Sequence, residues 1–393
     1  MNKYKRIFLI VVDSLGCGGA LDANLYQDEG SNTLYHVMQH QPFPQNALYQ
    51  LGISNIISLP HLPYNYNAQG YVCTMQEQSQ GKDTLSGHYE LMGCIVDEPF
   101  QTFTETGFPL SFMEQLKQAC GHGYVGNCAA SGTEIIKQYG EEVIKTGDMI
   151  IYTSSDSVLQ IAAHEQYFGL DELYRCCQIA RNMTKDGDIK VARVIARPFI
   201  GEDKDSFVRT SNRVDYALPP FQPTLLDALH PNYDVIGVGK INDIFCGQGI
   251  TRYIKSKSSI EGMNQTIQLQ KEDFNGLCFI NLVDFDMLWG HRRNVEGYHQ
   301  ELVQFDERLT QFIENMNQDD LLLITADHGN DPTYRGSDHT RENVPLIAYS
   351  PSMQGKGHLV QRNCFGDVAA TIAENFNVKS PYINGKSFFK QLR

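Results

Sequence analysis

Three short apolar runs in this chain each end in a carboxylate, and this feature constrains the fold more than any other. The runs are residues 7–12, 277–283 and 321–326, and the carboxylates that follow them are those of Asp13, Asp286 and Asp327. Nearly continuous apolar runs of this length are typical of strands buried on both faces of a parallel sheet. Because ligands bind beyond the carboxyl ends of such strands, the three runs predict one shared site.

The segment between the second and third runs is predicted to be a helix. Its apolar residues recur at spacings of three and four, on one helical face; they are Leu302, Phe305, Leu309, Phe312, Ile313 and Met316. Strand, helix, strand is the crossover that parallel strands require. Further strands are expected at residues 234–238 and 344–349, and a closing helix at 368–376, with Asp367 as its N-cap.

The middle of the chain differs, and we predict that it forms an inserted domain. Between about 99 and 218 no predicted strand ends in a carboxylate of this kind, and Pro109 and Pro219-Pro220 lie near its boundaries. Strands are expected at 149–153 and 190–195, and a helix at 171–179. Since Asp13 has to meet ligands from the far end of the chain, this segment must leave the core sheet and return.

The expected fold class is therefore α/β, with a mostly parallel sheet flanked by helices and an inserted smaller α/β cap domain. The expected domains are a core made of residues 1–99 and 219–393 and a cap made of residues 100–218. A chain of 393 residues is long enough for two such domains.

Charge and composition exclude several partners. Acidic residues outnumber basic ones, 46 against 32, for a net charge of −14, which argues against a nucleic-acid surface. The apolar run near the N-terminus is too short for a signal peptide, and no stretch approaches a membrane span. The ten cysteines form no CxxC pair and are expected to be reduced, mostly buried thiols. We expect a cytoplasmic protein without nucleic-acid or membrane partners.

Three histidines accompany the three carboxylates. His328 directly follows Asp327, His339 comes eleven residues later, and His291 follows Asp286 by five. Mixed oxygen and nitrogen ligands suit Mn, Zn or Fe better than Ca. These side chains are too many for one catalytic ion with an open position, but suit two ions roughly 3.5–4 Å apart that clamp a phosphoryl group. Any one of them alone would more often be structural; their joint placement favours metal.

A nucleophile is the second chemical feature. The stretch Gly81-Lys-Asp-Thr-Leu-Ser-Gly-His88 places two hydroxyls between glycines, which is also typical of a surface turn. A hydroxyl oxygen near two cations could attack phosphorus and carry a phosphoryl group. Spacing alone does not distinguish Thr84 from Ser86.

The chain resembles the phosphopentomutases of the alkaline phosphatase superfamily over nearly its whole length. The motifs that carry the resemblance are residues 6–14, 28–33, 81–84, 130–136, 152–158, 193–199, 209–216, 239–245, 281–286, 290–293 and 325–332. Several of them lie in the inserted segment. One departure follows Thr84, where the family has Thr-Thr-Gly-His-Trp and this chain has Leu85-Ser-Gly-His-Tyr89, so the packing around the nucleophile is expected to differ slightly.

The resemblance implies a role for each site residue. It implies that Thr84 is the phosphorylated nucleophile and contacts both metals, that Asp13, Asp327 and His328 hold one ion, and that Asp286, His291 and His339 hold the other. The substrate pocket implied by the resemblance consists of Ser154, Asp156, Arg193, Ile195, Arg209 and Lys240. Mn²⁺ is the favoured ion, and a sugar bisphosphate such as glucose 1,6-bisphosphate or ribose 1,5-bisphosphate is the activator.

The implied activity is the interconversion of pentose 1-phosphates and pentose 5-phosphates, with ribose and 2-deoxyribose phosphates as small-molecule partners. Two alternatives use the same residues. A phosphatase or phosphodiesterase on this scaffold would share the metal set, although the inserted motifs argue against it. A protein in which the metals are only structural would need no hydroxyl nucleophile.

Overall fold

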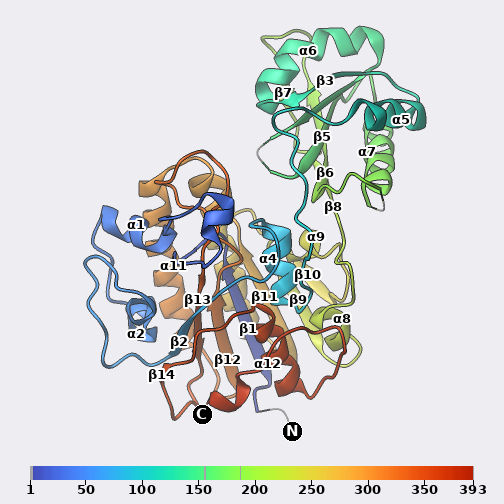
Figure 1. Cartoon of the computed structure of the whole chain (residues 1–393). Coiled ribbons are helices and arrows are strands. Elements are labelled where there is room, and N and C mark those ends of the chain that lie inside the picture. Colours follow the sequence, from blue (N-terminus) through green and yellow to red (C-terminus); the bar gives the residue numbers. More distant parts are fainter. Residues whose placement is uncertain (1–2, 155, 186, 393) are drawn as a thin grey trace. The chain divides into compact units, whose positions relative to one another are not determined.

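The computed structural model describes residues 3–154, 156–185 and 187–392, and Figure 1 shows the course of the chain. The chain divides into two compact units, a core unit made of residues 1–98 and 220–393 and an inserted unit made of residues 99–219. Each unit has its own sheet. The action of the inserted unit as a cap remains a prediction.

The core unit contains an eight-stranded sheet in the order β10-β9-β11-β1-β12-β13-β2-β14. The strands are β1 (Arg6–Val12), β2 (Tyr71–Met75), β9 (Asp234–Val238), β10 (Arg252–Ile254), β11 (Gly276–Leu282), β12 (Asp320–Thr325), β13 (Val344–Tyr349) and β14 (Gly357–His358). The strands from β10 to β12 are parallel, and β13 runs antiparallel to both β12 and β2. The predicted α/β class with a mostly parallel sheet is confirmed, with β13 reversed.

The three apolar runs are the central strands of this sheet. β1 lies between β11 and β12, with Val12 paired with Leu282 and Val11 paired with Thr325. Every residue of β1 and β11 is buried, as expected for strands covered on both faces. Because the pairing is in register and parallel, the residues that follow the three strands emerge at the same edge.

Helices cover both faces of the core sheet. Phe8 of β1 meets Phe312 of α11 (Val295–Glu314), with ring centroids 5.0 Å apart. Phe279 of β11 meets His88 of α4 (Thr84–Leu91), with ring centroids 5.8 Å apart. Phe279 pairs with Leu9 rather than with Phe8, so it points to the opposite face.

The other helices of the core unit are mostly short. They are η1 (Ala23–Tyr26), α1 (Thr33–His40), α2 (Ala47–Leu51), α3 (Ile53–Ile56), α8 (Leu225–Leu229), α9 (Ile241–Ile244), α10 (Ser259–Leu269), η2 (Phe285–Gly290), α12 (Gly366–Phe376) and η3 (Phe389–Gln391). Within the described residues, no helix is both long enough and apolar enough to cross a membrane.

The start of α12 differs from the prediction. Phe365, and not Asp367, is the N-cap, and Asp367 lies in the first turn of the helix. The carboxylate of Asp367 accepts hydrogen bonds from Arg362 Nε at 2.6 Å and from the backbone N–H of Lys386 at 2.5 Å. An acidic residue is favourable in a first turn without capping it, and the ion pair with Arg362 determines its position here.

The inserted unit is a second α/β layer structure. Its sheet has the order β3-β4-β5-β6-β7, with β8 also paired to β6. The strands are β3 (Tyr124–Ala129), β4 (Met149–Thr153), β5 (Val158–His164), β6 (Arg193–Ile200), β7 (Val208–Arg209) and β8 (Val214–Ala217), and the helices are α5 (Leu110–Cys120), α6 (Gly132–Thr146) and α7 (Leu170–Lys185). The strand expected at 149–153 is β4, whereas the strand expected at 190–195 begins only at Arg193 and continues to Ile200.

The two faces of this sheet have separate cores. Residues such as Leu159 and Val194 pack with α5 and α7 on one face, whereas Ile150 and Phe199 pack with α6 on the other. The helix expected at 171–179 lies within α7. Since each face is covered by its own helices, the inserted unit has its own hydrophobic core.

A buried carboxyl group in α11 makes stability depend on pH. Asp306 is fully buried and accepts a hydrogen bond from the Leu48 N–H at 2.7 Å, and burial raises the pKa of Asp306 to about 7. The unfolded chain ionises this group near pH 4, so the wild-type protein loses stability as the pH rises from about 4 to about 7. We expect Asp306→Asn to gain roughly 2 kcal/mol relative to wild type between pH 5.5 and pH 8. Urea unfolding at both pH values measures this difference, and a constant difference would contradict the assignment.

Candidate active site

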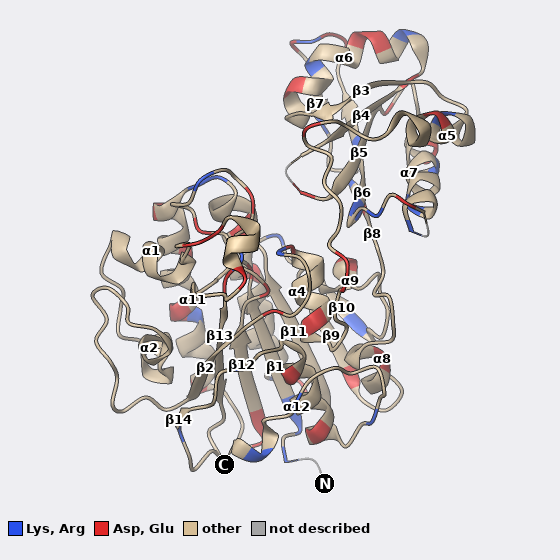
Figure 2. Ribbon diagram, in the orientation of Figure 1, with Lys and Arg blue, Asp and Glu red and all other residues tan. Residues whose placement is uncertain are grey.

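Three carboxylates meet at the carboxyl ends of β1, β11 and β12. Asp13 and Asp327 follow β1 and β12 directly, and Asp286 lies in η2, just after β11. All three are buried. Figure 2 shows acidic segments gathered in the loops at this end of the core sheet. A group of anions with so little access to water requires positive charge nearby.

The three predicted histidines lie among these carboxylates. His328 Nε2 is 3.5 Å from Asp13 Oδ1 and 3.4 Å from Asp327 Oδ2. Asp286 is 3.1 Å from His291 Nε2 and 3.3 Å from His339 Nε2, and these two nitrogens are 3.1 Å apart. The structure thus brings the six residues together. Asp13, Asp327 and His328 form one candidate metal-binding group, and His328 also lies within reach of Asp286 and His339.

Backbone carbonyl groups fix the tautomers of two of these histidines. His291 Nδ1 donates to the Ser337 carbonyl oxygen at 2.7 Å, and His328 Nδ1 donates to the Gly329 carbonyl oxygen at 3.1 Å. The Nε2 lone pair of each ring is then available to a cation, in the arrangement typical of metal-binding histidines.

The electrostatics of the group fit divalent cations. Burial raises the pKa of Asp13 well above its ordinary value, and the neighbouring Asp327 and Asp286 carboxylates raise it further. Burial also acts to raise the pKa of Asp286, but the adjacent His291 and His339 outweigh it and lower that pKa. Among the described residues, no hydrogen-bond donor reaches Asp13 Oδ1. Carboxylate and imidazole donors of this kind suit two transition-metal ions.

The two candidate nucleophiles have different surroundings. Thr84 is the first residue of α4, and its Oγ1 lies 3.3 Å from His328 Nε2. Ser86 is buried, and its hydroxyl donates to the carboxylate of the N-cap residue Asp83 at 2.7 Å as part of a capping box. The geometry therefore favours Thr84 as the hydroxyl that is available for chemistry.

A buried arginine fastens the loop that leads to Thr84. Arg341 donates to Glu77 Oε2 at 2.5 Å, to the Ser79 carbonyl oxygen at 2.9 Å and to the Gly81 carbonyl oxygen at 2.5 Å. It also pairs with Asp22 at 2.8 Å. Arg341 is only two residues beyond His339, so it joins the loop before Thr84 to the loop that carries His339.

Four polar residues that lie in the quoted motifs, but were given no role there, support the predicted ligands. Asn281 donates to Asp13 Oδ2 at 2.7 Å, and His88 Nδ1 lies 3.0 Å from Asp327 Oδ2. Asn330 donates to Asp286 Oδ1 at 2.7 Å and accepts a hydrogen bond from Arg293 at 2.5 Å. Asn281 was detectable in principle, because it is a lone amide within an otherwise apolar run.

Removing one of these supports should weaken the metal site without removing a ligand. In Asn330→Ala, Asp286 loses the hydrogen bond that orients it, and Arg293 loses an acceptor. Outer partners of metal ligands contribute about 10- to 100-fold in metal affinity, so we expect a loss of that size. Titration of the metal-free protein with Mn²⁺ measures it. A variant at Asn317, which lies away from the ligands, provides the control, and unchanged affinity in Asn330→Ala would refute the role.

The predicted substrate residues lie mostly in the inserted unit. They are Ser154 after β4, Asp156 before β5, Arg193 and Ile195 on β6, and Arg209 on β7, while Lys240 is the N-cap residue of α9 in the core unit. Arg193 is paired with Asp156 at 3.3 Å. The guanidinium of Arg209 lies 3.2 Å from the Tyr152 hydroxyl. These contacts place two cations on one sheet.

Arg197 is a further cation that the sequence analysis did not single out. It lies on β6 at alternate spacing with Arg193 and Ile195, on the same face of the sheet, and Figure 2 shows basic segments along this strand. Its Nε donates to Gln160 Oε1 at 2.9 Å, and burial, with the nearby charge of Arg213, lowers its pKa to about 10. The period-two spacing of charges within a strand was the available signal.

Fold and site together define an α/β metalloenzyme, and a model of the metalloenzyme superfamily matches residues 5–380. The chain is 54% identical to the phosphopentomutase of Clostridium perfringens strain 13, over 97% of both chains. It is 53% identical to the phosphopentomutase of Clostridium botulinum strain Alaska E43, over 100% of both. The chain therefore belongs to the phosphopentomutase family, and it is an isomerase of the phosphotransferase type.

A solved structure agrees with the fold. The phosphoglycerate mutase of Leishmania mexicana, crystallised at low cobalt concentration, superposes with a TM-score of 0.50 over 97% of each chain, at 11% identity. At this identity the similarity concerns the fold alone. The superfamily and the candidate metal-binding groups at the ends of the strands support the use of divalent metal ions.

Proposed function

We propose that this enzyme interconverts ribose 1-phosphate and ribose 5-phosphate, and the corresponding 2-deoxyribose phosphates, in the cytoplasm. The reaction passes through phosphorylated Thr84 and a pentose 1,5-bisphosphate. The observation that carries the proposal is the position of Thr84 Oγ1, 3.3 Å from His328 Nε2 within a group of buried carboxylates and imidazoles. Family membership supports the substrate class.

The reaction consists of two phosphoryl transfers in opposite directions, first from Thr84 to the sugar and then from the sugar to Thr84. A hydroxyl oxygen of the incoming pentose phosphate bonds to phosphorus while the bond from phosphorus to Thr84 Oγ1 breaks, and the hydroxyl proton is released. The resulting bisphosphate then presents its other phosphate. Thr84 Oγ1 bonds to that phosphorus and the second sugar oxygen leaves, taking up a proton. This second transfer leaves Thr84 phosphorylated again.

We propose Asp13, Asp327 and His328 as ligands of one divalent ion and Asp286, His291 and His339 as ligands of the other, with Thr84 in contact with both. The ions, with Mn²⁺ favoured, would neutralise charge on the transferring group and lower the pKa of the Thr84 hydroxyl. Thr84 also begins α4, so the positive end of the helix dipole favours the added phosphate charge.

The remaining residues bind and shield the substrate. Arg193 and Arg209 hold the phosphate that is not reacting, because guanidinium groups match phosphate oxygens. Asp156 accepts hydrogen bonds from sugar hydroxyls, and Ser154, Ile195 and Lys240 complete the pocket. The inserted unit acts as a cap that excludes water. A sugar bisphosphate, such as glucose 1,6-bisphosphate or ribose 1,5-bisphosphate, primes the cycle by phosphorylating Thr84.

One assay distinguishes this activity from its alternatives. The purified enzyme is incubated with Mn²⁺, glucose 1,6-bisphosphate and ribose 1-phosphate, and ribose 5-phosphate and free phosphate are measured together. We expect ribose 5-phosphate to exceed free phosphate by a large factor. Free phosphate as the main product would indicate a hydrolase, and unchanged substrate would indicate metal sites that only stabilise the fold.

Removing a substrate arginine should affect substrate use but not the metals. A charge-assisted hydrogen bond contributes about 1.5–3 kcal/mol, so we expect Arg193→Ala and Arg209→Ala each to lower kcat/KM about 10- to 100-fold. Neither residue is among the proposed ligands, so the Mn²⁺ content and the substrate-independent phosphorylation of Thr84 should persist. Lys145→Ala, which removes an exposed cation in the last turn of α6 in the same unit, is a control for loss of a positive charge. Loss of bound Mn²⁺ in Arg193→Ala would contradict the assignment.

A further inference from the structure

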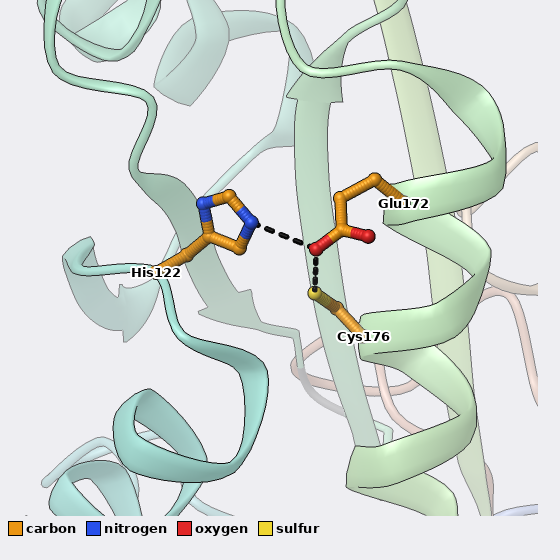
Figure 3. A group of neighbouring side chains, drawn as sticks. All are labelled: His122, Glu172 and Cys176. Atoms are coloured by element: carbon orange, nitrogen blue, oxygen red, sulfur yellow. Dashed lines mark hydrogen bonds and ion pairs between the residues drawn. The ribbon is translucent and has the colours of Figure 1, made fainter.

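A second group of metal-binding side chains lies within the inserted unit and takes no part in the proposed reaction. Figure 3 shows His122, from the loop between α5 and β3, facing Glu172 and Cys176 of α7. One ligand atom from each residue lies within 4.8 Å of the others. Glu172 and Cys176 are four residues apart, so the helix presents both on one face.

Hydrogen bonds leave the His122 ring in need of a cation. Its Nδ1 lies 2.9 Å from the Gly147 carbonyl oxygen, which can only accept, so Nδ1 carries the hydrogen. The other ring nitrogen, Nε2, lies 2.8 Å from Glu172 Oε1. A nitrogen lone pair and a carboxylate oxygen repel each other at this distance, so either a proton or a metal ion must lie between them.

The sulfur atoms favour the metal ion. Cys176 Sγ lies 4.0 Å from the same oxygen of Glu172, and the side chain is fully buried. A second thiol is close by, because Cys120 Sγ lies 3.9 Å from the Cys176 carbonyl oxygen. If His122 and Glu172 only shared a proton, no sulfur atom would be required beside them.

Arg175 is consistent with such a site. Its Nη2 lies 2.5 Å from Glu172 Oε1, and the same nitrogen donates to the Cys120 carbonyl oxygen at 2.5 Å. A divalent ion bound to the Glu172 carboxylate and the Cys176 thiolate has its two charges balanced. The occupied site is then neutral overall, so the positive charge of Arg175 does not oppose it.

We propose that His122, Glu172 and Cys176 form a site for a thiophilic divalent ion such as Zn²⁺, with a solvent molecule as the fourth ligand. Zn²⁺ takes four sulfur, nitrogen and oxygen ligands in a tetrahedron. The Cys176 thiol releases its proton to solvent when it binds the ion. The bound ion fastens the loop after α5 to the first turns of α7 and stabilises the inserted unit.

Cobalt absorption tests the site in the intact enzyme. The Mn²⁺-loaded protein is titrated with Co²⁺, and thiolate-to-cobalt charge-transfer absorption is recorded in the near ultraviolet. Co²⁺ that enters the catalytic site gives no such band, because the ligands proposed there include no sulfur. We expect one equivalent of Co²⁺ to produce the band and Zn²⁺ to remove it by displacement.

Variants identify the ligands. Cys176→Ser should abolish the band, and His122→Asn should weaken Co²⁺ binding at least tenfold. Cys177→Ser, which removes the neighbouring buried thiol on the same helix, should retain it. Glu172→Gln, which changes a partly exposed side chain and keeps its shape, serves if Cys176→Ser does not fold, and it too should weaken the band. Absence of the band in wild type, or a full band in both Cys176→Ser and Glu172→Gln, overturns the proposal.

Discussion

Replacement of Thr84 by Ala is expected to abolish mutase activity, by about 10⁴-fold or more, while the fold and most of the metal affinity remain. The hydroxyl is the proposed phosphoryl carrier, and neither binding energy nor metal ions can replace a missing covalent intermediate. As one contact beside those of the six other proposed ligand residues, it should contribute little to holding the ions. The measurement is ribose 5-phosphate formed from ribose 1-phosphate, together with Mn²⁺ content by elemental analysis.

Two further variants separate the hydroxyl from its surroundings. Thr84→Ser should retain partial activity, because serine offers the same oxygen on a less restricted side chain. Ser86→Ala removes part of the capping box, which costs about 1 kcal/mol of stability, and should leave turnover close to that of wild type. Mass spectrometry after incubation with a sugar bisphosphate should locate one phosphate on Thr84. A phosphate on Ser86, or normal turnover by Thr84→Ala, would overturn the mechanism.

The sequence was enough to predict that the three aspartates lie together, because the register of the strands determines where each strand ends. In a parallel sheet, strands of similar length end at one edge, and β11, β1 and β12 are adjacent and in register. A carboxylate after each strand must then lie near the others. The antiparallel direction of β13 could not be foreseen in the same way, since a buried apolar run reads alike in both directions.

The choice between Thr84 and Ser86 illustrates what spacing alone leaves open. Both hydroxyls lie in one short glycine-flanked stretch, and only the beginning of α4 at Thr84 separates their roles. Asp83 becomes the N-cap, its carboxylate engages the hydroxyl of Ser86, and Thr84 is left beside His328. The resemblance to the family pointed to the same residue for a different reason.

Ion pairs between residues far apart in the chain could not be predicted from the sequence. Arg341 joins residues more than 250 positions away in the chain, and nothing local marks it as buried. Likewise, Arg362 forms an ion pair with Asp367, which the local sequence pattern predicted to be an N-cap. In both cases a tertiary partner, and not the neighbouring residues, decides the conformation.

Loss of Arg341 should be the most damaging single change to the fold near the site. The side chain is 2% exposed, and Arg341→Met would leave the carboxylate of Glu77, which is also buried, without its opposing charge. Breaking a buried pair in this way costs about 3–5 kcal/mol. The loop that carries Thr84 also loses the hydrogen bonds to the Ser79 and Gly81 carbonyl oxygens, so activity should fall together with stability.

The stability loss of Arg341→Met should also depend on pH, in a direction that the pKa of Glu77 determines. Burial already raises the pKa of Glu77 well above its ordinary value, and Arg341 acts to lower it. Without Arg341 the folded protein holds Glu77 in its protonated form more strongly, whereas the unfolded chain ionises it near pH 4.5. The folded state of Arg341→Met therefore loses stability as the pH rises, and its deficit relative to wild type should be larger at pH 8 than at pH 5.

Urea unfolding of three variants at both pH values completes the test. Arg341→Met with Glu77→Gln should recover part of the loss at pH 8, because no carboxylate is then left unpaired. Arg335→Met, which removes an exposed arginine six residues earlier, should stay within about 0.5 kcal/mol of wild type. If Arg341→Met unfolded like the Arg335 variant, or if its deficit were the same at both pH values, the buried pair would not be what holds the nucleophile loop in place.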